Sequence, residues 1–166
     1  MAQIAVSSDS PEATSAIAAA LAGLCRAGDL IVLAGEMGAG KTAFAQGFGA
    51  ALGVTEPITS PTFTLVHSYA AGRVALHHAD VYRLERMGEL ADLALGELLE
   101  FDGIVLIEWG DVIAGALGDH LEVRLTADSL EQTEHRRIEI RSSGSRWAQR
   151  WSAVVRAVNS EPGAGC

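Results

Sequence analysis

The chain has 166 residues, 49% of them hydrophobic, and carries 12 Lys and Arg against 21 Asp and Glu. This length fits one domain with one core, which we predict over residues 1–158, followed by a flexible tail over residues 159–166. The formal net charge of −9 argues against a protein that holds nucleic acid by itself, since binding to phosphates needs a basic surface.

The apolar stretches are too short to span a bilayer, and the N-terminus lacks the basic and then apolar segments of a signal peptide. We therefore expect a cytoplasmic protein without membrane contact. The two cysteines agree with this, because Cys25 falls on the apolar side of a predicted helix and Cys166 ends the tail. Neither a disulfide nor a cysteine metal site is expected.

The chain begins with a predicted strand over residues 2–8, followed by Ser10 as a helix N-cap and Pro11 in the first turn. We expect the helix to end at Gly28. Its apolar side is formed by residues at helical spacing, namely Ile17, Leu21, Leu24 and Cys25.

The next segment, GEMGAGKT over residues 35–42, fits the pattern G-x-x-x-x-G-K-[ST] at every fixed position. An apolar run over residues 30–34 precedes it, as a buried parallel strand would. Behind it, Phe44, Phe48 and Leu52 recur at helical spacing, and Gly53 stands where a helix C-cap is expected. The strand, loop and helix together predict a phosphate-binding loop of an α/β protein.

Such a loop binds a nucleoside triphosphate because its glycines let the backbone wrap around the phosphates, while the helix directs unpaired N–H groups at them. Lys41 would reach the β- and γ-phosphates, and the Thr42 hydroxyl would ligate Mg²⁺. The residues predicted to bind the nucleotide are Met37, Gly38, Ala39, Gly40, Lys41 and Thr42.

The segment over residues 55–62, TEPITSPT, is too rich in Pro, Ser and Thr for a helix or a central strand. In this position it is either a switch that senses the γ-phosphate, with Ser60 or Thr62 near Mg²⁺, or a rigid turn fixed by its two prolines. Two strands over residues 63–69 and 73–79 follow and predict an antiparallel hairpin.

The hairpin leads into HHADVYRL, where Asp80 stands at a strand end. Asp80 would hold Mg²⁺ through water or orient the attacking water, or else cap the following segment. His77 and His78 are interpreted as ordinary strand residues. A His-His-Asp metal site is disfavoured, because neighbouring strand residues point to opposite faces.

A helix is predicted over residues 87–100, and a buried strand over residues 104–107 then ends at Glu108. A carboxylate after four apolar residues is the Walker B arrangement, which meets Mg²⁺ or its water shell. Trp109 is either a core anchor or part of a second switch.

The last part of the chain predicts two antiparallel strands over residues 120–126 and 136–142, with alternating apolar residues. One amphipathic helix is predicted to follow. It contains Trp147, Trp151, Val154, Val155 and Val158.

Together, GEMGAGKT, SPTFTLVHSY, HHADVYRL and IEW resemble the bacterial TsaE (YjeE) family, the ATPase of tRNA threonylcarbamoyladenosine synthesis, from about Ser10 to Arg141. The resemblance implies a three-layer P-loop fold with a mostly parallel sheet and antiparallel edge strands. It also implies that ATP hydrolysis supports turnover by a TsaB–TsaD complex, which would engage the tRNA.

Residue by residue, the resemblance makes Lys41, Asp80 and Glu108 the catalytic positions and Thr42 and Glu108 the Mg²⁺ ligands. It places Ser60 and Thr62 in the first switch and Trp109 beside a nucleotide-sensitive switch. The family often has Asp-Leu where this chain has Glu36-Met37, and the match is poor beyond Arg141.

Two other functions stay open. The first is a small-molecule kinase with Asp80 as base, although no arginine-rich lid is present in the sequence. The second is a switch protein that binds ATP without useful turnover. A GTPase is disfavoured because the chain has no Asn-Lys-x-Asp segment. We expect the isolated chain to hydrolyse ATP poorly, since no arginine finger is evident in the sequence. Arg83 is either a candidate for this role within the chain or the partner of an acidic neighbour.

Overall fold

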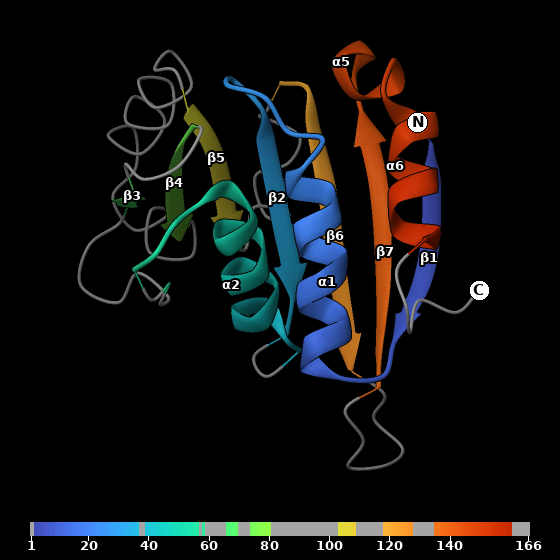
Figure 1. The fold of residues 1–166 in the computed structure, drawn as a ribbon. Helices are drawn as coiled ribbons and strands as arrows, with labels where there is room; N and C mark the ends of the chain where they lie inside the picture. The colour runs from blue at the N-terminus through green and yellow to red at the C-terminus, as the bar shows by residue number, and fades with distance from the viewer. Residues whose placement is uncertain are drawn as a thin grey trace.

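The structure, a computed structural model, describes residues 2–36, 39–56, 58, 66–69, 74–80, 103–108, 118–127 and 135–160. Figure 1 shows the helices α1, α2 and α6 on one face of a sheet. The helices are α1 (Pro11–Ala22), α2 (Lys41–Leu52), α5 (Ser145–Ala148) and α6 (Trp151–Asn159). The strands are β1 (Gln3–Ser8), β2 (Leu30–Gly35), β3 (Val66–Tyr69), β4 (Ala75–Asp80), β5 (Gly103–Glu108), β6 (His120–Ala127) and β7 (Arg136–Ser143).

The described strands form one sheet in the order β1-β7-β6-β2-β5-β4-β3. β2 pairs in parallel with β5 and with β6, and β4 pairs in parallel with β5. The pairs β3–β4, β6–β7 and β1–β7 are antiparallel. The predicted parallel centre with antiparallel strands toward the edges is therefore confirmed, and so is the hairpin of β3 and β4.

The two central strands β2 and β5 are buried along almost their whole length, as their continuous apolar runs predict. Their residues alternate between the two faces of the sheet. Leu33 and Leu106 belong to the same core cluster as Phe44 of α2, whereas Val32 and Val105 are buried outside that cluster. The face that α1 and α2 cover can thus be identified residue by residue.

The start of α1 confirms the predicted cap, because the backbone N–H of Ala13 donates to Ser10 Oγ at 3.0 Å. The predicted end was wrong, since α1 stops at Ala22 and the chain turns there. Gly28 lies in the turn before β2, with a φ of +90° that favours glycine. Cys25 is nevertheless buried, as its apolar neighbours predict.

Helices α1 and α2 approach each other closely at Gly47. A Cβ at Gly47 would lie 2.7 Å from Cα of Ser15, in α1, which is closer than carbon atoms pack. A glycine in the interior of a helix lowers its intrinsic stability, so this position is explained by the contact between the helices.

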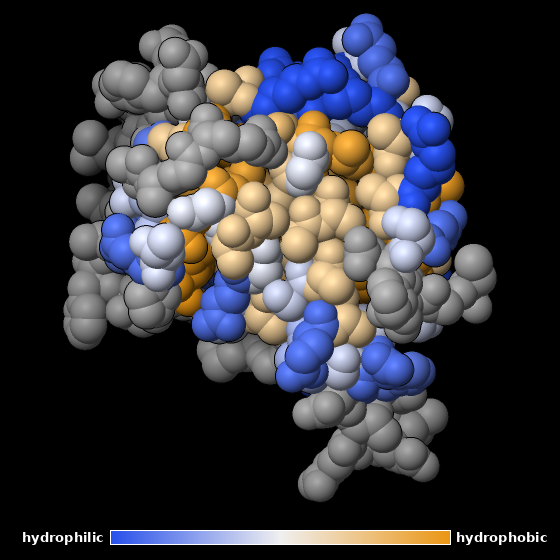
Figure 2. All heavy atoms as spheres, viewed as in Figure 1, coloured by the Kyte–Doolittle hydropathy of each residue, from blue (hydrophilic) through white to orange (hydrophobic). Residues whose placement is uncertain are grey.

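The middle of the helical face is covered by hydrophobic residues, and hydrophilic residues concentrate above and below it (Figure 2).

The single C-terminal helix of the prediction is two helices. α5 ends at Ala148, and α6 begins at Trp151 after a break at Gln149 and Arg150. Trp147 is fully buried in α5, and Val154 and Val158 are the buried residues of α6. The break redirects the chain so that both helices bury an apolar side. The predicted tail beyond α6 lies outside the described residues, apart from the helical Asn159 and the turn at Ser160.

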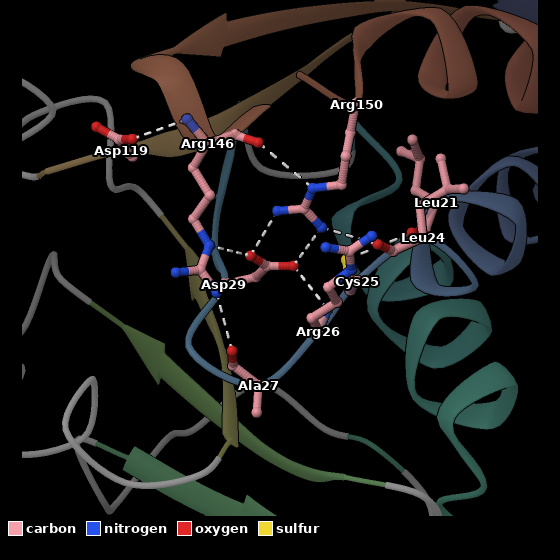
Figure 3. A network of polar contacts seen from close by, with 9 residues as sticks. All are labelled: Leu21, Leu24, Cys25, Arg26, Ala27, Asp29, Asp119, Arg146 and Arg150. Carbon is pink, nitrogen blue, oxygen red and sulfur yellow. Dashed lines mark hydrogen bonds and ion pairs between the residues drawn. The ribbon is translucent and has the colours of Figure 1, made fainter. Parts of the chain in front are cut away.

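A polar network at the start of β2 fixes these helices to the sheet (Figure 3). The Asp29 carboxylate is fully buried. It accepts hydrogen bonds from Arg146 Nε at 2.7 Å and from both terminal nitrogens of Arg150 at 2.7 and 2.8 Å. The backbone N–H of Arg26 donates a further hydrogen bond to it at 2.6 Å. The guanidinium of Arg150 also lies 3.9 Å from the ring centroid of Trp147. β2 is therefore held at its beginning by residues far along the chain.

The predicted helix over residues 87–100 falls outside the described residues. In the described ranges, no helix has the length and apolar character needed to cross a membrane.

Candidate functional site

The phosphate-binding loop begins where β2 ends, at the lower edge of the sheet in Figure 1. Gly35 has a φ of +144°, and a Cβ on it would lie 2.5 Å from the carbonyl oxygen of Leu125 in β6. Only glycine therefore allows the loop to leave the sheet this close to its neighbour. The loop turns back through a hydrogen bond from the Ala39 N–H to the Glu36 carbonyl at 3.1 Å.

Helix α2 begins at Lys41 with Gly40 as its N-cap, in the left-handed region at a φ of +102°. No described side chain caps this end, so its first backbone N–H groups are directed toward the loop. Lys41 is buried at 9% exposure, while Thr42 beside it is exposed. A helix start without a side-chain cap, with a lysine as its first residue, suits a phosphate group.

Glu108 ends β5 beside this loop. Its register partner in β2 is Leu33, which lies on the face covered by α2. Because paired residues of parallel strands point to the same face, the Glu108 side chain lies on the α2 side of the sheet. Asp80, the last residue of β4, is the partner of Glu108 on its other side. The backbone thus brings both predicted acidic positions to the edge of the sheet that carries the loop. The structure describes the backbone of Asp80 but not its side chain.

The side chain of His78 in β4 lies beside Glu108. The distance from His78 Nε2 to Glu108 Oε1 is 3.4 Å, and the two side chains are 1% and 4% exposed. The sequence predicts His78 as an ordinary strand residue, and this contact is a finding of the structure. The signal was its spacing of two residues from Asp80, which puts both positions on one face.

His77 points to the opposite face, as the alternation of a strand predicts. Its Nδ1 lies 2.8 Å from Ser68 Oγ, and burial lowers the pKa of His77 below its ordinary value. Among the described residues, no three His, Cys, Asp or Glu side chains form a metal-binding group. His77 and His78 thus point to opposite faces of the sheet.

Arg136, at the start of β7, is a second residue beside the loop that is not among the predicted site residues. Its Nε donates to the carbonyl of Ala39 at 3.1 Å, across 97 positions of sequence. Arg136 shares a face with Ile138, which packs in the core cluster with α1 and α2. A cation on the apolar side of an alternating strand is the sequence signal that could have identified it.

A cavity of about 260 Å³ lies beside Arg136, where β6 ends and β7 begins. Its described lining is Thr126, Ala127, His135, Arg136 and Arg137. It lies on the β6 side of β2, whereas Glu108 lies on the β5 side. The loop therefore stands between a carboxylate on one flank and an open space on the other.

Several predicted site residues lie outside the described ranges, so their predicted roles stay predictions. They are Met37 and Gly38 of the loop, the switch candidates Ser60, Thr62 and Trp109, and Arg83.

A buried strand that turns through glycines into a helix beginning at Lys41-Thr42 is characteristic of P-loop nucleotide-binding proteins, and the fold and site place this chain in that class. The model of the family described as "Threonylcarbamoyl adenosine biosynthesis protein TsaE" matches residues 8–138. The chain belongs to the TsaE family, which confirms the resemblance seen in the sequence.

Individual relatives agree with the family model. A Bacillus subtilis protein, "tRNA threonylcarbamoyladenosine biosynthesis protein TsaE", is 45% identical over 103 residues, which are 62% of this chain and 64% of that protein. A Streptomyces coelicolor protein of the same name is 38% identical over 135 residues, covering 77% of this chain and 89% of the relative. The crystal structure of Bacillus subtilis YdiB matches with a TM-score of 0.75 and 31% identity, over 93% of this chain and 95% of that one.

Proposed function

We propose that this chain is the ATPase subunit that supports tRNA N6-threonylcarbamoyladenosine synthesis, as a single domain over residues 1–158. The observation that carries the proposal is the joint placement of Lys41 and Glu108 at one edge of the sheet, on the face that α2 covers. Membership of the TsaE family supplies the pathway, since the relatives carry the name of this tRNA modification.

The residues of the site fit ATP with Mg²⁺. Glu108 is a buried carboxylate with His78 Nε2 at 3.4 Å, and a divalent cation would offset the unfavourable burial of its charge. With the Thr42 hydroxyl, Glu108 would hold Mg²⁺, which neutralises charge on the β- and γ-phosphates when bound. Lys41 and the N–H groups at the start of α2 would bind the phosphates, and Asp80 would orient the attacking water or the hydrated metal.

The orientation of the nucleotide follows from the same arrangement. Mg²⁺ and the γ-phosphate belong on the β5 side of the loop, because Glu108 lies there. The nucleoside would then extend toward β6, where the cavity beside Arg136 provides space.

The partners that we propose are TsaB and TsaD, with tRNA bound by their complex. The net charge of −9 favours this arrangement, since a separate basic surface would hold the RNA. Such a partnership would place the protein in the cytoplasm. Hydrolysis is expected to be slow in the isolated chain and faster with the partners, because a transition-state cation supplied by a partner raises rates of this reaction by about 10³–10⁵-fold.

The experiment measures release of phosphate from ATP by the protein alone and with purified TsaB and TsaD. Lys41→Ala tests phosphate binding, and Glu108→Gln tests the metal carboxylate without changing its size. Stimulation by the pair that disappears in both variants would support the proposal. Absence of stimulation despite tight Mg²⁺–ATP binding would overturn it and favour the kinase, which a screen of phosphate acceptors tests directly.

Support of tRNA modification by Glu108→Gln would instead favour a switch that binds ATP without needing hydrolysis. The two readouts, phosphate release and tRNA modification, therefore separate the ATPase from both alternatives.

A further inference from the structure

His78 has an arrangement that folding alone does not explain. Its side chain is 1% exposed. Neither ring nitrogen has a hydrogen-bond partner in the part of the chain that the structure describes. A buried polar group without a partner destabilises a fold, and an apolar side chain of similar size would avoid this penalty.

The neighbouring His77 shows that this strand can satisfy a histidine. Its Nδ1 is 2.8 Å from the hydroxyl of Ser68, its register partner in β3. The unpaired nitrogens of His78 are thus specific to its face of the sheet, which is the face of Glu108 and α2.

The ring of His78 lies beside the proposed metal carboxylate. Nε2 is 3.4 Å from Glu108 Oε1, within reach of a hydrogen bond but without the geometry of one. Contacts of this kind in a site without ligand often shorten and align only when the ligand binds. Partners that orient a metal-binding carboxylate commonly change metal affinity by about 10–100-fold when they are removed.

We propose that His78 is a positioning residue for Glu108: its Nε2–H donates to Glu108 Oε1 when Mg²⁺ and nucleotide bind, and so fixes the carboxylate in the orientation that the metal needs. This inference rests on the proposed function, because it takes Glu108 as a Mg²⁺ ligand. It assigns His78 no contact with the nucleotide.

The test measures the affinity of the full chain for a non-hydrolysable ATP analogue by calorimetry, once with Mg²⁺ and once with EDTA. His78→Leu removes the donor and keeps an apolar filling of the space. His78→Gln places an amide N–H close to the position of Nε2, and His78→Asn carries the same group on a shorter side chain. His77→Leu is the matched control, since it changes the adjacent histidine on the opposite face.

We expect His78→Leu and His78→Asn to lose about tenfold in affinity with Mg²⁺ and to be unchanged in EDTA. His78→Gln should retain most of the affinity, and His77→Leu should match the wild type. In a Glu108→Gln background, His78→Leu should have no additional effect, because the group that it orients is gone.

Equal Mg²⁺ dependence in wild type, His78→Leu and His78→Asn would overturn the role of His78 while leaving the proposed function intact. A wild-type protein that does not bind the analogue at all would overturn the proposed function. If His78→Leu does not fold, the comparison of His78→Asn with His78→Gln decides the question, because both keep a polar amide in the core.

Discussion

Replacing Asp29 by Asn removes one charge from the network that joins β2 to the C-terminal helices. The carboxylate is fully buried, while the Arg150 side chain is 10% exposed and that of Arg146 43% exposed. An amide in its place has the same shape but can accept through only one of its two end atoms. Guanidinium groups built to surround a carboxylate would then face an N–H₂ group.

The expected loss of unfolding free energy is about 3–5 kcal/mol, the range for breaking one side of a buried ion pair. Four hydrogen bonds from described residues reach the carboxylate, and charged hydrogen bonds of about 1.5–3 kcal/mol each would sum to more. The sum overestimates the loss, because Arg146 is well exposed and its interaction is screened by water. The Arg150 and Arg26 contacts account for most of the effect.

Urea unfolding followed by circular dichroism at pH 7 measures the change, and the melting temperature should fall by roughly 6–20 °C. Asp119→Asn is the control, because Asp119 is exposed and accepts from the backbone N–H of Arg146 at 3.0 Å. Asn serves equally well at the start of a helix, so this variant should stay within about 0.5 kcal/mol of wild type. A loss below about 1 kcal/mol for Asp29→Asn would refute the reasoning.

The pH dependence supplies a second check. Burial by itself would raise the pKa of Asp29, but hydrogen bonds from Arg150, Arg26 and Arg146 outweigh it and lower the pKa below its ordinary value of 3.8. A lowered folded-state pKa means that the stabilisation is fully present above pH 3.8 and is lost as the pH falls through the folded-state value. The difference between wild type and Asp29→Asn should therefore be constant from neutral pH down to about pH 4–5 and shrink only below that.

Two further changes test the packing and the loop. Gly47→Ala should destabilise the protein by about 1–3 kcal/mol in a urea titration, because the new methyl group meets the backbone of α1. Gly23→Ala is the control, since a Cβ at Gly23 would have no contact nearer than 3.4 Å. Its free energy of unfolding should be within about 0.5 kcal/mol of wild type. Arg136→Ala should weaken binding of a nucleotide roughly three- to tenfold by calorimetry, since it frees a loop carbonyl from its hydrogen bond. Arg141→Ala, on the other face of the same strand, should bind normally; equal affinities for both arginine variants would contradict a role in holding the loop.

The elements that sequence predicts well are those whose pattern is local. The strand before the loop, the helix from Lys41 with Gly53 as its C-cap, and Glu108 at the end of a buried strand are all confirmed. In each case the apolar run or periodicity is strong and a glycine or carboxylate marks its end. The hairpin of β3 and β4 follows the same rule.

The errors and omissions have a different origin, because they depend on contacts between distant segments. The apolar pattern predicts that α1 continues beyond Ala22. The helix instead ends there, and the backbone N–H of Gly23 caps it. The break between α5 and α6 places Arg150 against Asp29, 121 positions away. Likewise, His78 and Arg136 carry only weak sequence signals, a spacing of two from Asp80 and a cation on an apolar face, and the sheet register is needed to place them beside the site.

β2 is the fourth of the seven strands in the described part of the chain and has parallel partners on both sides. Its amides are therefore expected to exchange with solvent only when the whole sheet opens, while those of the edge strands β1 and β3 exchange through smaller fluctuations. Because the phosphate-binding loop continues directly from β2, a bound nucleotide is attached to the cooperative unit that unfolds last. The binding free energy of the nucleotide would consequently add to the global stability of the protein, and saturation with ligand should slow exchange in the core strands as well as at the loop.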